Sequence, residues 1–240
     1  MPVGTTPPGW RGAIRGFSRR SKRRLMEKLI GVDWEPLLEG VGKRSSEVKA
    51  VLLTLTYPSA FSASWEDWKR DLEVLRKRIK RNWPIDFAIW KEEFQERGAP
   101  HFHILIVFRG VVNLAAFRQW VSLAWYEIVG SEDPKHLAAG TNVRAMYGPV
   151  QRLLRYLMKY LAKVVESPEA TGRIWGVWGK IPYEVIARFN LRGRSCVQLG
   201  RRVRKWGKKS RYLRRLRRPR FLIFGDGAAL AALMRGLDTE

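Results

Sequence analysis

Residues 86–109 read DFAIWKEEFQERGAPHFHILIVFR, and this stretch decides the fold. Its two ends, 86–94 and 101–109, are rich in aromatic and β-branched residues, which suit the half-buried surface of a sheet. Residues 95–100 between them are mostly polar and include Gly98, a residue type that is typical of a turn. The stretch therefore predicts a β-hairpin whose turn centres near Arg97 and Gly98.

The segments that flank this hairpin predict a mixed fold. The helix after Ser64 carries an apolar stripe at helical spacing, formed by Trp68, Leu72, Leu75 and Ile79. The remaining predicted elements are a strand at 50–57, a helix capped by Asn113, a short strand at 141–146 and a helix at about 150–165. The order β-α-β-β-α-β-α predicts an α+β, ferredoxin-like (RRM-like) domain with a central antiparallel sheet flanked by helices.

The charge of the chain is strongly positive and unevenly spread. The 240 residues include 46 Lys and Arg against 22 Asp and Glu, a net charge of +24, and residues 192–220 carry 14 basic and no acidic side chains. We therefore expect a basic N-terminal extension (1–49), a compact domain (50–191) and an Arg-rich arm with a short apolar tail (192–240). Such an excess indicates a nucleic-acid partner, and the alternative is a solvated, solubilising arm.

Several protein classes are excluded or disfavoured. Cys196 is the single cysteine, so neither a disulfide framework within the chain nor a multi-cysteine metal site is possible. No uncharged apolar run reaches the length of a membrane span, and the first residues lack the apolar stretch of a secretion signal. We expect a cytoplasmic protein without a membrane partner.

His101 and His103 lie two residues apart on a predicted strand, so their imidazoles project to the same face. A hairpin centred at residue 97 places Glu93 opposite His101. Two imidazoles and one carboxylate can hold a divalent ion and leave positions open for substrate. Two alternatives remain, namely a chance meeting of core-edge histidines with a surface glutamate, and the ligand set of a non-haem iron oxygenase. His136 is expected to be a plain surface residue.

Residues 156–163 read YLMKYLAK. Helical spacing places Tyr156 and Tyr160 on one face and Lys159 and Lys163 on an adjacent one. A phenol becomes a nucleophile when it ionises, and neighbouring lysines favour ionisation. In the alternative, the tyrosines pack against a core and the lysines face solvent.

Taken in order, three segments resemble the motifs of the HUH endonuclease superfamily. They are residues 53–58 (LTLTYP), 93–103 (EFQERGAPHFH) and 156–163. Within that superfamily the chain resembles the rolling-circle replication initiators of plasmids and phages, in the two-tyrosine form of the gene-A-type phage initiators. The resemblance covers roughly 50–180, and it includes 172–176 (GRIWG).

This resemblance implies a site-specific nickase and strand transferase that acts on single-stranded or melted origin DNA through a 5′-phosphotyrosine. The implied metal ligands, for Mg²⁺ or Mn²⁺, are Glu93, His101 and His103. The implied nucleophile pairs are Tyr160 with Lys163 and Tyr156 with Lys159. Since the sequence holds no Walker-type phosphate loop, we expect a separate helicase and host replication proteins as partners.

Further residues are candidates for contacts with DNA. They are Arg152 and Arg155 beside the tyrosines, and Lys205, Lys208, Lys209 and Arg214 in the basic arm. Trp206 and Tyr212 are candidates for stacking on unpaired bases, and all of these side chains can equally face water. Two alternative functions remain at this stage. One is an HUH-type transposase or relaxase, and the other is a basic DNA- or RNA-binding protein without catalytic activity.

Overall fold

A computed structural model of the chain describes residues 17–32, 34, 45–147, 172–182, 193–207 and 235. The chain divides into two compact units, Met1–Glu184 and Val185–Glu240. The helix predicted at about 150–165 lies outside the described residues, so the structure does not test it.

The first unit is built on one antiparallel sheet with the strand order β4-β1-β3-β2-β5. Its strands are β1 (Glu47–Thr56), β2 (Ile85–Phe94), β3 (Pro100–Asn113), β4 (Thr141–Ala145) and β5 (Trp175–Gly179). The first four strands have the order of a ferredoxin-like split βαβ unit, with β3 in the middle of the sheet. The predicted α+β fold is confirmed.

The β2–β3 hairpin has the register that the sequence predicted. Glu93 pairs with His101, and Lys91 pairs with His103. Gly98 takes a φ of 78° in the turn, a conformation that suits a residue without a Cβ. The Arg97 guanidinium donates hydrogen bonds to the carbonyl of Tyr57, at 2.6 Å, and to the next carbonyl along the chain, which ties the turn to the end of β1.

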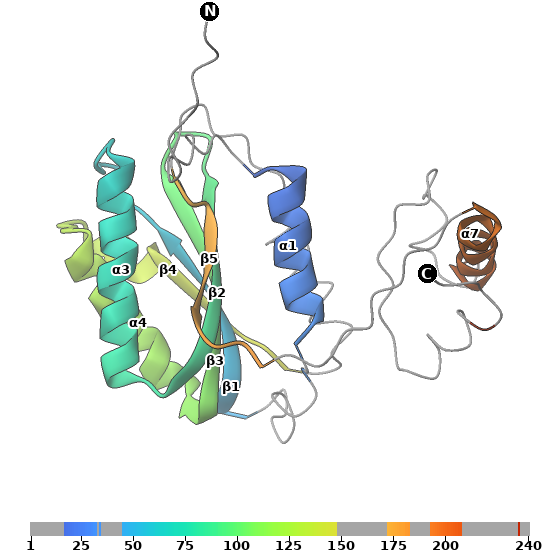
Figure 1. The fold of residues 1–240 in the computed structure, drawn as a ribbon. Helices are drawn as coiled ribbons and strands as arrows, with labels where there is room; N and C mark the ends of the chain where they lie inside the picture. The colour runs from blue at the N-terminus through green and yellow to red at the C-terminus, as the bar shows by residue number, and fades with distance from the viewer. Residues whose placement is uncertain are drawn as a thin grey trace, which may run out of the picture. The chain divides into compact units, whose positions relative to one another are not determined.

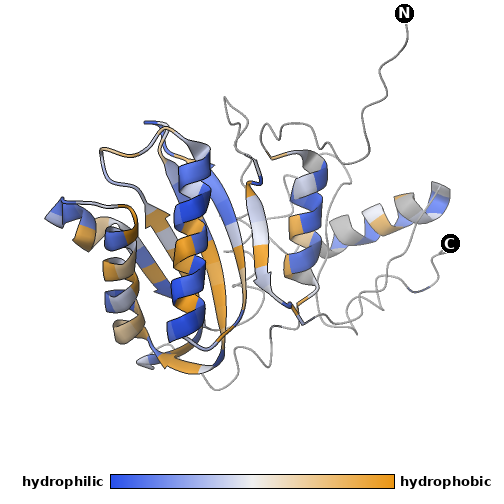
Figure 2. Cartoon of the chain, turned by 60° about the vertical axis from the view of Figure 1, so that its left-hand side comes forward, coloured by the Kyte–Doolittle hydropathy of each residue, from blue (hydrophilic) through white to orange (hydrophobic). Residues whose placement is uncertain are grey.

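Helices α3 (Trp65–Asn82) and α4 (Leu114–Ile128) cover one face of the sheet (Figure 1). The predicted cap at Asn113 is confirmed, and Ser64 caps the other helix, because the side chains of both residues accept a hydrogen bond from the first turn. The four residues of the predicted α3 stripe are buried in the core between these helices and the sheet. In Figure 2 the strands beneath α3 are largely hydrophobic, while α3 itself presents many hydrophilic residues.

Helix α1 (Arg19–Ile30) covers the other face of the sheet (Figure 1). Its Leu25 and Leu29 are fully buried, whereas Arg23 and Arg24 are exposed. The Trp175 indole of β5 donates a hydrogen bond to the Ser21 hydroxyl at 2.6 Å. This part of the basic N-terminal extension is therefore an amphipathic helix whose apolar side closes the second face of the sheet.

The expectation that His136 is a plain surface residue is wrong. It lies on a short helix, α5 (Pro134–Ala139), and its side chain is only 7% exposed. Its Nε2 donates to the carbonyl of Thr56 at 2.8 Å, and the Trp125 indole donates to the same carbonyl at 2.9 Å. The helical turn after Asp133 directs the imidazole inward, toward the end of β1.

In the second unit, part of the Arg-rich tract forms helix α7 (Gly193–Gly207). Lys205 is exposed on it, and Arg202 donates a hydrogen bond to the carbonyl of Arg235 at 2.5 Å. Among the helices that the structure describes, none combines the length and the apolar character needed to cross a bilayer.

Candidate functional site

A polar cluster lies on the α1 side of the sheet, where β1, β2 and β3 run side by side. Alternation along β3 directs Phe102 into the α3/α4 core and His101 and His103 to the opposite face. Thr56 pairs with His101 and Thr54 pairs with His103, so the two threonines share that face. We call Thr54, Thr56, Lys91, Glu93, His101 and His103 the histidine cluster.

Each histidine of the cluster is held by a threonine of β1. His103 Nδ1 lies 3.2 Å from Thr54 Oγ1, and His101 Nδ1 lies 3.3 Å from Thr56 Oγ1. The two rings meet edge to face, with their centroids 4.8 Å apart. Fixing Nδ1 in this way orients an imidazole so that Nε2 is the nitrogen that a metal would take, which is how supporting hydrogen bonds position metal-binding histidines.

Glu93 is joined to two neighbours on the same face. Its Oε1 accepts a hydrogen bond from Lys91 Nζ at 2.7 Å, and its Oε2 lies 3.5 Å from His103 Nε2. Burial by itself raises the pKa of Glu93, but the hydrogen bonds from His103 and Lys91 and their charges outweigh it and lower the pKa to about 2. The carboxylate is therefore ionised at neutral pH, as metal binding requires.

Lys91 is a member of the cluster that the sequence analysis missed. Its side chain is fully buried, and its ammonium lies 5.1 Å from the centre of the Phe17 ring, next to the start of α1. A buried ammonium needs a partner, and Glu93 supplies one. The signal in the sequence was the pairing position of Lys91, directly opposite His103 on the predicted hairpin.

The donor set of the cluster fits a divalent cation, since it combines one ionised carboxylate with two imidazoles, which bind a metal in their neutral form. As the side chains stand, Glu93 is engaged by Lys91 and His103. Within the described ranges, no three His, Cys, Asp or Glu side chains are arranged so that they could hold a metal ion. Metal binding at this cluster thus requires Glu93 to exchange at least one of these partners for the ion.

The other predicted site residues cannot be placed beside the cluster. Most of them lie outside the described residues, namely Tyr156, Lys159, Tyr160, Lys163, Arg152, Arg155, Lys208, Lys209 and Arg214. Lys205 is described, on α7 in the second unit. The nucleophile pairs and the DNA contacts therefore remain predictions.

Tyr57, in the first of the resembling segments, is not suited to nucleophilic attack. Its ring is buried on the α3/α4 side of the sheet, away from the histidine cluster, and its hydroxyl donates to Asp71 at 2.9 Å. Burial, followed by the negative charge of Asp71, raises the pKa of this phenol, so it stays protonated.

Comparison with known proteins connects this domain to DNA replication. Residues 50–165 match the family described as replication-associated protein ORF2/G2P. The replication-associated protein G2P of Pseudomonas phage Pf3 is 26% identical over 214 residues, which cover 85% of this chain and 73% of that protein.

Two proteins of Xylella fastidiosa, both provisionally named as replication proteins, are also similar. The one from strain 9a5c is 28% identical over 199 residues, which cover 75% of this chain and 62% of that protein. The one from strain Temecula1 is 29% identical over 197 residues, with coverages of 75% and 67%. All three similar proteins are thus named for replication.

Proposed function

We propose that this chain is a rolling-circle replication initiator that nicks one DNA strand at a specific site and later rejoins it. One observation carries the proposal. The β2–β3 register places Glu93 opposite His101, with His103 on the same face, inside the region that matches the replication-associated family. The resemblance of three segments to the HUH motifs, in the expected order, supports the same conclusion.

In this proposal Glu93, His101 and His103 hold Mg²⁺ or Mn²⁺, with Thr54 and Thr56 orienting the rings. The ion, when bound, polarises the phosphoryl oxygens of the scissile phosphate. Neutral imidazoles coordinate through one nitrogen, so the Nδ1 proton of each ring is donated to its threonine hydroxyl. Lys91 offsets the charge of the carboxylate from the buried side of the cluster.

Tyr160, supported by Lys163, is the proposed first nucleophile. Its phenolate oxygen forms a bond to phosphorus, the bond from phosphorus to the 3′ oxygen breaks, and that oxygen leaves as a 3′-hydroxyl after taking a proton. The 5′-phosphate stays on the tyrosine. Tyr156 then cuts the regenerated site in the same way and takes over the new 5′-phosphate. The 3′-hydroxyl released by this second cut attacks the phosphorus on Tyr160, the tyrosine oxygen leaves, and the strand is rejoined. Strand separation is assigned to a separate helicase.

The experiment uses a randomised pool of single-stranded oligonucleotides labelled at the 3′ end, because the protein stays attached to the fragment that carries this label. Incubation of the full chain with Mn²⁺, followed by a denaturing gel, is expected to show a labelled covalent adduct. Sequencing the attached fragments then reads out the cleavage site. Replacing both Tyr156 and Tyr160 with Phe is expected to abolish the adduct and leave DNA binding intact.

A second readout tests the metal without relying on catalysis. Mn²⁺ is expected to raise the melting temperature of the wild-type chain and not that of Glu93→Gln, because only the folded state presents the ligands together. An adduct that survives in the double Phe variant or in EDTA would contradict the mechanism. Tight DNA binding without an adduct under any metal would favour the non-catalytic alternative.

A further inference from the structure

We propose that a pocket between α3 and β5, on the side of the sheet opposite the histidine cluster, binds an unpaired nucleotide of single-stranded DNA. The pocket has a volume of about 440 Å³, within the range of small-molecule sites. The inference rests on the proposed function in one respect, since it assumes that the substrate includes unpaired bases. It adds a contact that lies apart from the reacting phosphate.

Three tryptophans give the pocket its aromatic lining, namely Trp65, Trp90 and Trp178. Trp90 and Trp178 are each 7% exposed and form fixed walls, whereas Trp65, in the first turn of α3, is 37% exposed. A large aromatic side chain that is partly exposed beside two buried ones offers a flat face to a ligand. Base stacking on such faces is the usual way in which proteins hold single strands without reading their sequence.

The chain positions these rings by close backbone contacts. A Cβ added at Gly176 of β5 would lie 2.7 Å from Trp90 Nε1, and one added at Gly172 would lie 3.0 Å from Trp65. Both glycines come from the segment GRIWG, which precedes and enters β5. The backbone of this segment therefore lies directly against the indoles, and the pocket walls are packed rather than loosely arranged.

The charges of the pocket suit one phosphate group. Its cationic lining residues are Lys69, Arg76 and Arg173. Lys69 is joined to the buried Glu92 beneath the pocket, and Arg76 is joined to Glu73 by two hydrogen bonds. The remaining positive charge belongs to Arg173, which is exposed at the start of β5. Among the described residues that line the pocket, only Arg173 is a cation without an acidic partner. An aromatic wall beside one such guanidinium matches a nucleotide, which has one base and one negative charge.

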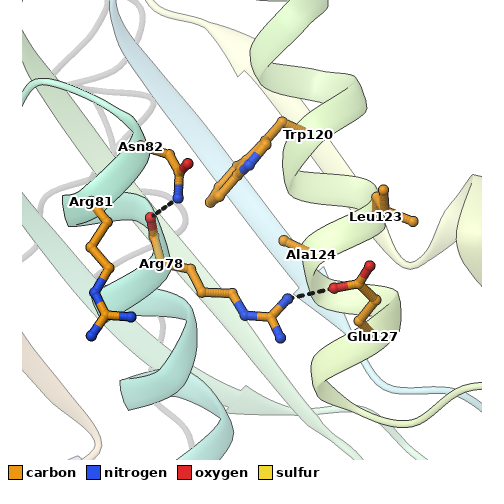
Figure 3. Close-up of a pocket in the computed structure, with 7 residues that line it drawn as sticks. All are labelled: Arg78, Arg81, Asn82, Trp120, Leu123, Ala124 and Glu127. Carbon is orange, nitrogen blue, oxygen red and sulfur yellow. Dashed lines mark hydrogen bonds and ion pairs between the residues drawn. The ribbon is translucent and has the colours of Figure 1, made fainter.

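Another cavity on the same side of the sheet has a different character (Figure 3). It lies between α3 and α4, and it is lined by Arg78, Arg81, Asn82, Trp120, Leu123, Ala124 and Glu127. An ion pair of 2.6 Å between Arg78 and Glu127 crosses it. It offers one tryptophan instead of three, so we assign the base to the α3/β5 pocket and use this cavity as the control.

The test measures binding of a fluorescent oligothymidylate of about twelve nucleotides to the full chain in EDTA, so that no cleavage occurs. Trp65→Leu removes the aromatic face and is expected to weaken binding about tenfold, whereas Trp65→Phe keeps that face and is expected to bind nearly as well as wild type. Binding to a duplex of the same length is expected to be unchanged in both variants, because paired bases cannot enter the pocket.

The matched control for charge compares Arg173→Gln with Arg81→Gln. Both remove one exposed arginine from the same side of the domain. Arg173→Gln is expected to weaken binding severalfold and to lower the salt dependence by about one phosphate contact, while Arg81→Gln has the smaller effect. Equal losses in the two variants would mean that only the overall charge matters, and this would overturn the assignment of the phosphate to Arg173.

Cross-linking of the wild-type chain to an oligonucleotide that contains 5-iododeoxyuridine provides a test free of folding effects. The modified peptide is expected to contain Trp65 or Trp178. Wild-type affinity in Trp65→Leu, or cross-links that map only elsewhere, would overturn the pocket. The adduct assay separates the two proposals. If the wild-type chain forms no adduct but Trp65→Leu weakens binding, the proposed function fails and the pocket stands. If the wild-type chain forms the adduct but Trp65→Leu binds like wild type, the pocket fails and the proposed function stands.

Discussion

Glu92 and Glu93 are neighbours in β2, yet their carboxyl groups lie on opposite faces of the sheet. Glu92 is fully buried on the α3 side and bonds to Lys69, and burial raises its pKa. Glu93 lies in the histidine cluster, where its partners lower its pKa to about 2. Because successive side chains of a strand point to opposite faces, two adjacent carboxylates have different surroundings and opposite shifts in pKa.

The same alternation divides the work of β3. Phe102 belongs to the core that α3 and α4 cover, while His101 and His103 belong to the polar cluster. One face of the hairpin therefore stabilises the fold, and the opposite face carries the proposed chemistry. Adjacent substitutions should separate the two contributions.

The largest effects are expected from the pair His103→Ala and Phe102→Ala. His103→Ala is expected to reduce cleavage about a thousandfold or more, because it removes a proposed ligand of the ion, and such an ion contributes several kcal/mol to a transition state. Phe102→Ala is expected to lower the free energy of unfolding by about 3–5 kcal/mol, because it leaves a cavity in the core. Cleavage rates and urea denaturation of both variants give the comparison.

The two faces would not be separate if His103→Ala destabilised the chain as much as Phe102→Ala does. Metal-dependent stabilisation supplies the control. It should disappear in His103→Ala and persist in Phe102→Ala at temperatures where that variant remains folded.

A smaller effect is expected in the dependence of stability on pH. Since the pKa of Glu93 falls from 4.5 in the unfolded chain to about 2 in the fold, its ionised form stabilises the protein above about pH 4.5. That contribution is lost as the pH falls from there toward 2. Glu93→Gln is therefore expected to flatten the loss of stability in this window, measured by urea denaturation at a series of pH values without metal.

Glu92→Gln is the matched control, since it makes the same change one residue away. Because the pKa of Glu92 is raised, the folded chain binds its proton more readily than the unfolded chain, and its contribution to the slope has the opposite sign. If the free energy of unfolding changed equally with pH in Glu92→Gln and Glu93→Gln, the two faces would not shift the pKa of a carboxyl group in opposite directions.

Much of the first unit could be predicted from local patterns. The register of the hairpin followed from the position of the turn, and the cap at Asn113 followed from a residue type that accepts hydrogen bonds from a first helical turn. These features depend on residues that are near in the sequence. The pairing of Glu93 with His101 belongs to this group.

The features that sequence analysis missed depend on distant contacts. The burial of Leu25 in α1 depends on a sheet face that the basic composition of its helix does not reveal. The role of Lys91 depends on Phe17 and Glu93 together, and that of His136 on a carbonyl 80 residues away. A short polar segment around a lone histidine gives no sign of such a partner.

The smallest effect in this comparison is expected at His136, which supports the histidine cluster from the core side. Its Nε2 donates to the Thr56 carbonyl, and the Thr56 hydroxyl bonds to His101. His136→Ala is expected to cost about 1–3 kcal/mol of stability, because it leaves that buried carbonyl with fewer donors, and to slow cleavage severalfold. His136→Gln can donate again and is expected to restore most of the rate. If His136→Ala lost stability but kept the full cleavage rate in the remaining folded protein, the end of β1 would hold His101 without help from α5.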